Sequence, residues 1–565
     1  MDMPIESPIR HLPSHCLPSH CLPIRRVRSK RSDHPSDRAR HTLPWLLPCL
    51  LFLAGCRTTT IEQHEWRQID TPHFTLISNA RGTESAQLAR ELERFRALVL
   101  RVSGTPLAPE PVPTRIFLFA DWGSYFAYTA GTNMLGFNYP TLRANYLVIS
   151  PGVYHTDPKR IIFHEYVHYL LRHQRTRYPT WFDEGLAEFL SDVREVGDEL
   201  RVGNIPREGI NAHAIQWRIP LRELMATDFV LDWRPARIAA FYGQSWATVS
   251  YLLSQPVSTD AIDRRPQLAT YLRLLNAGEP RATAFEAAFG TNEAELTREV
   301  RRHLQRRRLP GIGVPIAELP PLADVRHRVL ASHAVAAELG ELTLLQGQQR
   351  APLAEQLFNR ALAVQPADGA ARAGLALALA QQQRYEEALA QAKRAVANTP
   401  TLARVHIDLA KILFGLCGDA ARATHPDCRR MLEVARTHFE QSVALAPHAP
   451  EAHAGMGMTL AQLQEDHAGA IEHLSYAYDL SQWLPQIGMA IAKLYLAEGR
   501  QAEARTSLTH VVRWAKSEQL RREAESLLAS LQADVQLPAT PLRRDLPGVV
   551  EPPTGGATGA SRPGS

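Results

Sequence analysis

The sequence predicts an α+β domain followed by an all-α array of helical repeats. Short stretches rich in β-branched and aromatic residues, such as Thr114–Phe119 and Tyr146–Ser150, alternate with stretches of helical spacing in the first half. The second half is rich in Ala, Leu, Gln and Glu, and the pattern Ala361–Pro366 returns 34 residues later as Ala395–Pro400. A Pro- and Gly-rich stretch at residues 309–321 separates the two halves.

The chain begins with a segment typical of an exported protein. A short apolar run at residues 43–53 follows Arg38 and Arg40 and ends in Leu53-Ala-Gly-Cys56. The run is too short to span a bilayer comfortably, and small residues precede the cysteine, as in signal peptides. This ending resembles a bacterial lipobox, so residues 1–56 are expected to be a signal peptide and Cys56 to carry a lipid anchor to the membrane. An ordinary signal peptide or an N-terminal anchor helix is the alternative.

The lipobox resemblance implies a place in the bacterial cell envelope, on the periplasmic face. Residue 57 is Arg, not the Asp that marks inner-membrane retention in many such proteins. We therefore favour the outer membrane over the inner membrane.

The charge of the chain gives no reason to expect nucleic acid as a partner. The net charge is +5, and residues 1–56 contribute +4 of it through eight basic and four acidic residues. The remainder is therefore near +1, whereas nucleic-acid binding needs a basic patch on the folded domain.

The first domain is expected to contain a small mixed sheet followed by helices. In order, we expect an extended strand at residues 66–78, a helix at 84–102, a strand at Thr114–Phe119, a helical turn at 122–126, a loop at 131–139, a strand at Tyr146–Ser150, a helix from Asp157-Pro158, a short helix at 219–224 and helices across 245–305. We expect the strand Tyr146–Ser150 to bind substrate by edge pairing.

The run His164-Glu165-Tyr166-Val167-His168 combines two imidazoles with a carboxylate. In a helix, residues i and i+4 lie on one face, so His164 and His168 can bind one metal ion together. Glu165 lies about 100° round the helix, where it can take a proton from a zinc-bound water with a pKa of about 7. A surface helix with two solvated histidines is the alternative.

A second acidic pattern follows in Trp181-Phe-Asp-Glu184-Gly-Leu-Ala-Glu188. Its helix is expected to begin at Pro179 or Thr180, because proline is favoured in a first turn. Glu184 and Glu188 then share one face of that helix.

Together the two motifs, HExxH and W-x-x-E-G-x-x-E, resemble those of gluzincin metallopeptidases. The likeness is to bacterial peptidase-MA-like families and covers roughly residues 66–305. It implies an α+β zincin-like fold for residues 57–307 and one zinc ion per chain. The implied zinc ligands are His164, His168 and Glu184, and Glu188 is implied to hydrogen-bond His164 and to fix its orientation.

A third segment, Phe241-Tyr242-Gly-Gln-Ser-Trp246, resembles the Y-x-Q-S-W segment of the same families. In related aminopeptidases a tyrosine at a similar position donates to the oxyanion, which makes Tyr242 the candidate here. A half-buried tyrosine at the start of an amphipathic helix is the alternative. The aminopeptidase motif for N-terminal amines is absent, so the resemblance implies no exopeptidase activity.

Repeats fill residues 324–536, after a linker at residues 308–323. The pattern seen at Ala361–Pro366 occurs a third time at Ser442–Pro447, and Gly374 and Gly455 lie where paired helices should approach closely. The period resembles that of tetratricopeptide repeats (TPRs), which implies one solenoid of roughly three to five repeats with a concave surface for a protein partner. A plain helical bundle is the alternative.

Cys417 and Cys428 are the only cysteines after Cys56, and they flank an insertion between repeats. In an oxidising periplasm a disulfide bond between them would add about 2–3 kcal/mol of stability. Two buried free thiols are the alternative. Residues 537–565, rich in Pro, Gly, Thr and Ser, are expected to be a disordered tail.

These features predict a membrane-anchored periplasmic zinc metallopeptidase that hydrolyses peptide bonds, with repeats that recruit the peptide or protein substrate or a protein partner. The rival hypothesis is a TPR scaffold lipoprotein for envelope protein complexes, with a peptidase-like domain that is catalytically weak or inert. A hydrolase of non-peptide amides, such as cell-wall links, would differ only in its substrate.

Overall fold

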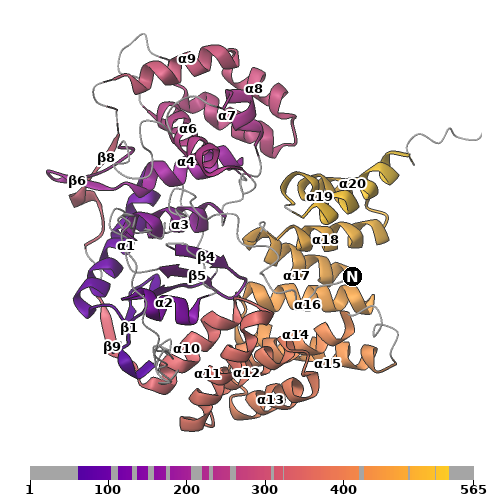
Figure 1. Ribbon diagram of the computed structural model, residues 1–565. Coiled ribbons are helices and arrows are strands. Elements are labelled where there is room, and N and C mark those ends of the chain that lie inside the picture. The colour runs from indigo at the N-terminus through magenta and orange to yellow at the C-terminus, as the bar shows by residue number, and fades with distance from the viewer. Residues whose placement is uncertain are drawn as a thin grey trace, which may run out of the picture.

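The computed structural model describes residues 61–103, 112–129, 136–149, 158–172, 178–204, 219–227, 233–254, 262–306, 309, 311–321, 324–418, 426–481, 484–515 and 517–533. The expected signal peptide with Cys56 and the expected tail at residues 537–565 lie outside these residues. In Figure 1 an α+β part lies beside a curved array of helices.

A six-stranded mixed sheet lies at the middle of the α+β part, in the order β4-β5-β3-β2-β1-β9. Its strands are β1 Arg67–Asp70, β2 Phe74–Ser78, β3 Thr114–Leu118, β4 Gly136–Pro140, β5 Asn145–Ile149 and β9 Arg326–Val329. The central strands β2, β3 and β5 are parallel, with Leu76 opposite Ile116 and Ile116 opposite Leu147. Strands β1, β4 and β9 pair antiparallel with their neighbours.

Three expectations about this sheet are wrong. Residues 66–78 form two antiparallel strands, because the chain turns at Thr71, whose hydroxyl oxygen accepts a hydrogen bond from the Phe74 amide. The loop expected at residues 131–139 contains most of β4, whose hydrogen bonds come from pairing with β5 rather than from a local pattern. Since β4 is the edge strand, β5 is enclosed between two neighbours and does not offer the free edge expected of Tyr146–Ser150.

Helices cover both faces of the sheet. The helices of this part are α1 Gly82–Ser103, α2 Trp122–Tyr128, α3 Pro158–Arg172, α4 Thr180–Ser191, α5 Leu221–Ala226, α6 Pro235–Leu253, α7 Arg265–Asn276, α8 Arg281–Phe289 and α9 Glu293–Leu304, with a 3-10 helix η2 at Ile61–Gln63. Leu76 and Ile116 share a core with α1, α3 and α4, while Ile77 and Phe117 share a second core with the first helices of the array. Because both faces are buried, the inner strands are nearly continuous apolar runs.

The stretch expected as a linker is part of the fold. A second sheet of three strands consists of β6 Arg194–Val196, β7 Glu199–Val202 and β8 Ile312–Pro315, and the 3-10 helix η3 Ile316–Glu318 follows. Strand β9, from residues expected in the repeat region, pairs with β1. The two parts of the chain are therefore joined by strand pairing as well as by a shared core.

In the described residues the array consists of ten helices in five successive pairs, followed by α20. The helices are α10 Ser332–Leu344, α11 Ala351–Val364, α12 Gly369–Gln381, α13 Tyr385–Asn398, α14 Ala403–Gly418, α15 Pro426–Leu445, α16 Pro450–Leu463, α17 His467–Leu480, α18 Pro485–Ala497, α19 Gln501–Trp514 and α20 Glu518–Ala533, with the 3-10 helix η4 at Gln348–Arg350. Gly374 packs against the ring of Phe358, and Gly455 packs in the same way against Phe439, where a Cβ atom would clash. The repeated pairing confirms the expected helical solenoid.

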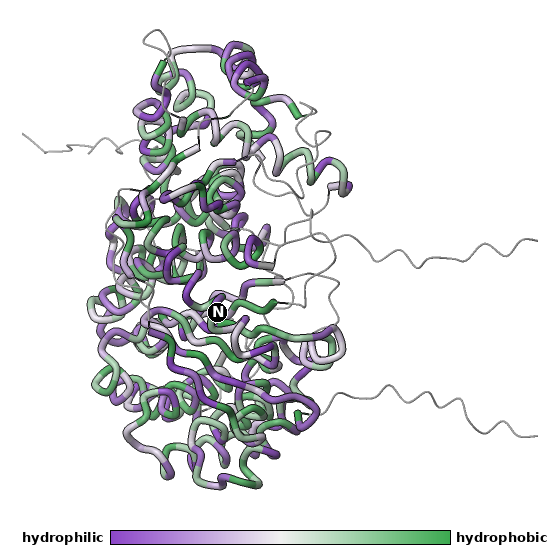
Figure 2. The backbone as a smooth tube through the Cα atoms, turned by 90° about the vertical axis from the view of Figure 1, so that its left-hand side faces the viewer, coloured by the Kyte–Doolittle hydropathy of each residue, from purple (hydrophilic) through white to green (hydrophobic). Residues whose placement is uncertain are grey.

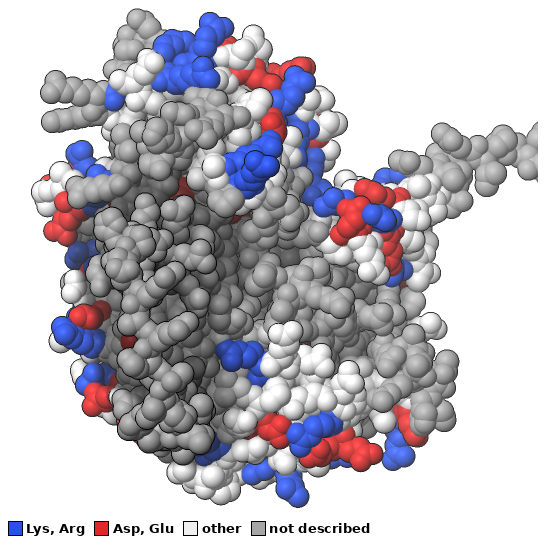
Figure 3. Space-filling model, viewed as in Figure 1, with Lys and Arg blue, Asp and Glu red and all other residues white. Residues whose placement is uncertain are grey.

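Polar and apolar residues alternate along the helices in Figure 2. None of the described helices combines the length and the apolar character needed to cross a membrane. On the face shown in Figure 3, positively and negatively charged side chains are interspersed.

Candidate metal centre

His164 and His168 of α3 meet Glu184 of α4 in the core of the α+β part. The Nε2 atoms of the two histidines are 3.0 Å apart. Glu184 Oε2 lies 3.3 Å from His164 Nε2 and 3.4 Å from His168 Nε2. All three side chains are at most 1% exposed. One helix face and the following helix therefore direct three ligand atoms to one point.

The spacing of these atoms fits a tetrahedral zinc site. Zinc bonds to imidazole nitrogen and carboxylate oxygen are about 2.0–2.1 Å long, which places tetrahedral ligand atoms about 3.3–3.4 Å apart. The observed separations of 3.0–3.4 Å are close to this value. Two imidazoles and one carboxylate are also a donor set of catalytic zinc sites, which leave a fourth position for water.

The centre has an excess of negative charge. Glu165 is 2% exposed, Glu184 and Glu188 are each 1% exposed, and Asp183 is 18% exposed. Arg160 of α3 forms an ion pair with Glu188. Among the described residues, four carboxylates stand against the Arg160 guanidinium and a protonated His168, which leaves a net charge of −2. Carboxylates gathered at one buried point favour a cation there, so the site is suited to a divalent metal ion.

The two histidines have opposite pKa shifts. Burial lowers the pKa of His164, and the neighbouring His168 adds to this effect against the opposing effect of Glu184. Burial acts in the same direction on His168, but the carboxylates of Asp183 and Glu184 outweigh it and raise the pKa of His168 to about 10. Metal ligation requires neutral imidazole, so zinc binding at pH 7 would release this proton.

Asp183 and Arg160 belong to the centre, and sequence reasoning missed both. Asp183 Oδ1 lies 3.0 Å from His168 Nδ1, which fixes the ring with Nε2 directed toward Glu184. The position of Asp183 next to the candidate ligand Glu184 was the available signal. Arg160 precedes His164 by one helical turn, so it faces the same side of α3.

Glu188 lies beside His164, but the expected hydrogen bond between them is absent. Glu188 Oε1 is 3.7 Å from His164 Nδ1, beyond hydrogen-bond distance. The other oxygen of this carboxylate, Oε2, pairs with the Arg160 guanidinium. Glu188 is therefore held beside the candidate ligand His164 by Arg160, a residue that the motif does not include.

Tyr242 lies near the centre, within α6. Its ring centre is 6.4 Å from that of His164, and the residue is 1% exposed. It lies in the middle of a helix that begins at Pro235, not at a helix start as the alternative interpretation required. Gly185 permits the close approach of α4 and α6, because a Cβ atom at this position would lie 2.5 Å from the Ser245 carbonyl oxygen.

Gln244 of the third motif has a structural role. Gln244 Oε1 accepts a hydrogen bond from the Ile219 amide at 3.1 Å, and its Nε2 donates to the Ile219 carbonyl at 2.8 Å. This pair of bonds fixes the start of the segment that leads into α5.

In the array, Cys417 and Cys428 are joined by a disulfide bond, with their Cα atoms 5.5 Å apart. The bond links the end of α14 to the start of α15 across the insertion between these helices.

Comparisons with known proteins concern the array. The family model for tetratricopeptide repeats matches residues 339–403, and a comparison with curated proteins finds no match. A thermophilic TPR protein of Thermus thermophilus is 28% identical over 35% of this chain and 99% of that chain, with a TM-score of 0.29. Pseudomonas aeruginosa pilF is 18% identical over 36% of this chain and 90% of that chain, also with a TM-score of 0.29. The family match therefore identifies residues 339–403 as tetratricopeptide repeats, a type of module that presents surfaces for protein–protein interaction.

Proposed function

We propose that this chain is a zinc-dependent metallopeptidase whose repeats engage a protein. The observation that carries the proposal is the convergence of His164, His168 and Glu184, with ligand atoms 3.0–3.4 Å apart. The excess of buried negative charge around them is further support, because it favours a divalent cation. The resemblance to gluzincins assigns the same three residues.

Each residue around the ligands has a distinct role in this proposal. A zinc ion held there would polarise the scissile carbonyl and lower the pKa of a water to about 7. Glu165 would take the proton of that water and then deliver it to the leaving amine. Tyr242 would donate to the oxyanion, and Asp183 would keep His168 in the ligating orientation.

The location of this activity is also a proposal. The lipobox resemblance at Leu53–Cys56 supports lipid anchoring at the periplasmic face of the bacterial envelope. The disulfide bond between Cys417 and Cys428 is in keeping with an oxidising compartment.

Glu165→Gln is the test of this proposal, because it removes the base while it keeps the three ligands. We expect the variant to bind zinc like the unaltered protein and to lose hydrolysis of a peptide library. Glu195→Gln, an exposed position on β6, is the matched control and should leave turnover unchanged. Hydrolysis by Glu165→Gln at the unaltered rate would refute the peptidase proposal.

A scaffold for envelope protein complexes is the second candidate function. It is favoured by the family match, which falls on the repeats alone. The two candidates differ in a deletion strain: a scaffold predicts that Glu165→Gln restores every lost phenotype, whereas a peptidase predicts that it restores none that depends on turnover.

A further inference from the structure

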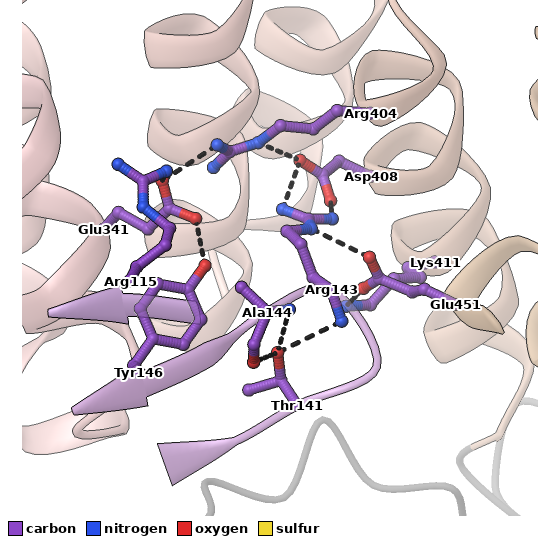
Figure 4. A network of polar contacts seen from close by, with 10 residues as sticks. All are labelled: Arg115, Thr141, Arg143, Ala144, Tyr146, Glu341, Arg404, Asp408, Lys411 and Glu451. Atoms are coloured by element: carbon purple, nitrogen blue, oxygen red, sulfur yellow. Dashed lines mark hydrogen bonds and ion pairs between the residues drawn. The ribbon is translucent and has the colours of Figure 1, made fainter. Parts of the chain in front are cut away.

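The hairpin of β4 and β5 ends in a tight, internally bonded turn against the array (Figure 4). The Thr141 hydroxyl donates to the Ala144 carbonyl at 2.8 Å and accepts hydrogen bonds from the amides of Arg143 and Ala144 at 3.1 and 3.0 Å. These bonds hold the backbone of the turn in one conformation. Arg143 is thereby presented at the tip.

Arg143 binds two carboxylates on two different repeats. Its Nη1 donates to Asp408 Oδ2 at 3.3 Å, its Nη2 also bonds Asp408, and its Nε donates to Glu451 Oε2 at 2.8 Å. Asp408 is on α14 and Glu451 is on α16, which are the first helices of consecutive pairs. The guanidinium therefore bridges neighbouring repeats, as a bound peptide side chain would.

A second arginine of the sheet extends the contact to the first repeat. Arg115 of β3 forms ion pairs with Glu338 and Glu341 of α10, and the Tyr146 hydroxyl donates to Glu341. Arg404 of α14 links the two halves of this network, because it contacts Glu341 at 2.9 Å and Asp408 at 3.5 Å (Figure 4).

The charges on the two sides of this contact are complementary. The array supplies the acids Glu338, Glu341, Asp408 and Glu451 and the bases Arg404 and Lys411, a net charge of −2. The sheet supplies Arg115 and Arg143, a net charge of +2. Asp408 is fully buried, and a buried carboxylate is unfavourable without its partner. Such complementarity gives specificity to an interface.

The other side of the same hairpin contacts the metal-binding helix. Asn138 of β4 is near the backbone carbonyl of Glu165, with its Nδ2 at 3.5 Å. A Cβ atom at Gly136 would lie 3.1 Å from a side-chain carbon of Ile161, so β4 and α3 are in close contact there. Arg143, which contacts the repeats, therefore lies only five positions beyond Asn138, which contacts α3.

We infer that the hairpin Gly136–Ile149 is an internal ligand of the tetratricopeptide repeats, with Arg143 as its anchoring side chain. The repeats act on their own chain: they hold the edge strand β4 in place beside α3. Arg143 is thus a positioning residue for this strand. The inference concerns the chain's own docking and does not depend on zinc or on hydrolysis.

Hydrogen exchange of the zinc-free, full-length protein tests this inference. We expect Arg143→Ala to raise the exchange rates of the β4 amides about tenfold or more. In this variant, local opening of β4 no longer has to break the buried ion pair between Arg143 and Asp408, so opening costs less free energy. Arg143→Lys, which keeps the charge opposite Asp408, should restore much of the protection. Arg384→Ala is the matched control, because Arg384 pairs only with Glu355 and Glu387 of the array in the described residues, and it should leave β4 unchanged.

Asp408→Asn probes the same contact from the array and keeps the side-chain shape. In the double variant with Arg143→Ala, exchange of β4 should be no faster than in Arg143→Ala alone, because that substitution already removes the contact with Asp408. Unchanged β4 protection in Arg143→Ala, or additive effects in the double variant, would overturn the inference. This exchange experiment would remain valid even if the protein showed no detectable peptidase activity.

Discussion

Replacement of Gly185 by alanine tests how the helices bring the proposed metal ligands together. A Cβ atom at this position would lie 2.5 Å from the Ser245 carbonyl oxygen and 2.7 Å from Val249 Cγ2. Ordinary contact begins at 3.4 Å, so α4 and α6 would have to separate by about 0.9 Å. Glu184, the next residue back along α4, would move with the helix.

The expected effects of Gly185→Ala follow from this displacement. Overpacking of this kind lowers the free energy of unfolding by about 1–3 kcal/mol. Metal–ligand distances tolerate only about 0.2 Å, so we also expect zinc affinity to fall by about tenfold or more. Chemical denaturation measures the first effect, and competition with a zinc chelator measures the second.

Gly82→Ala is the matched control for this substitution. Gly82 opens α1, and the atoms near a Cβ there belong to the flexible end of the Arg67 side chain, which can move aside. We expect both measurements to stay close to those of the unaltered protein. If Gly185→Ala retained full stability and zinc affinity, the argument that this glycine sets the α4–α6 distance would be wrong.

Three further predictions concern the shell of the centre and the array. Asp183→Asn should weaken zinc binding about 10–100-fold, as chelator competition would show, and unchanged affinity would remove Asp183 from the centre. Burial and a neighbouring histidine lower the pKa of His438 and of His473, so the unfolded chain binds protons more readily than the folded chain just below pH 6.5. This contribution to stability should therefore be complete above pH 6.5 and decrease as the pH falls below that value. The measurement is the melting temperature as a function of pH. If a variant with glutamine at both positions lost as much melting temperature per pH unit as the unaltered protein, the prediction would be wrong. Reduction of the bond between Cys417 and Cys428 should lower the stability of the array by about 2–3 kcal/mol in denaturant titrations, and a serine pair that is insensitive to reductant is the control.

The parts of the fold set by local periodicity could be predicted from the sequence. The i, i+4 spacing of His164 and His168 places both side chains on one helix face in any context. The repeats were predictable for the same reason, because each pair of helices follows a local pattern and packs mainly on its neighbours. Gly374 and Gly455 are where helix pairs meet, as that pattern requires.

The parts set by contacts distant in sequence could not be predicted. Strand β9 is exposed at all four positions and has no apolar alternation, so only its pairing with β1 makes it a strand. The Glu188 side chain was assigned to His164, but Arg160, which the motif leaves out, is its partner. The docking of Arg143 on Asp408 joins residues 265 positions apart, and no local pattern signals it.

Metal content is the most direct measurement of the central claim. Mass spectrometry on the purified protein from residue 57 onward should find about one zinc per chain, as a single site with two histidines and one glutamate requires. His164→Ala should lose this zinc, and His333→Ala, on α10 and away from the site, should keep it. A folded protein without zinc after supplementation, or equal zinc in His164→Ala, would contradict the metal centre and leave the repeats as the functional part of the chain.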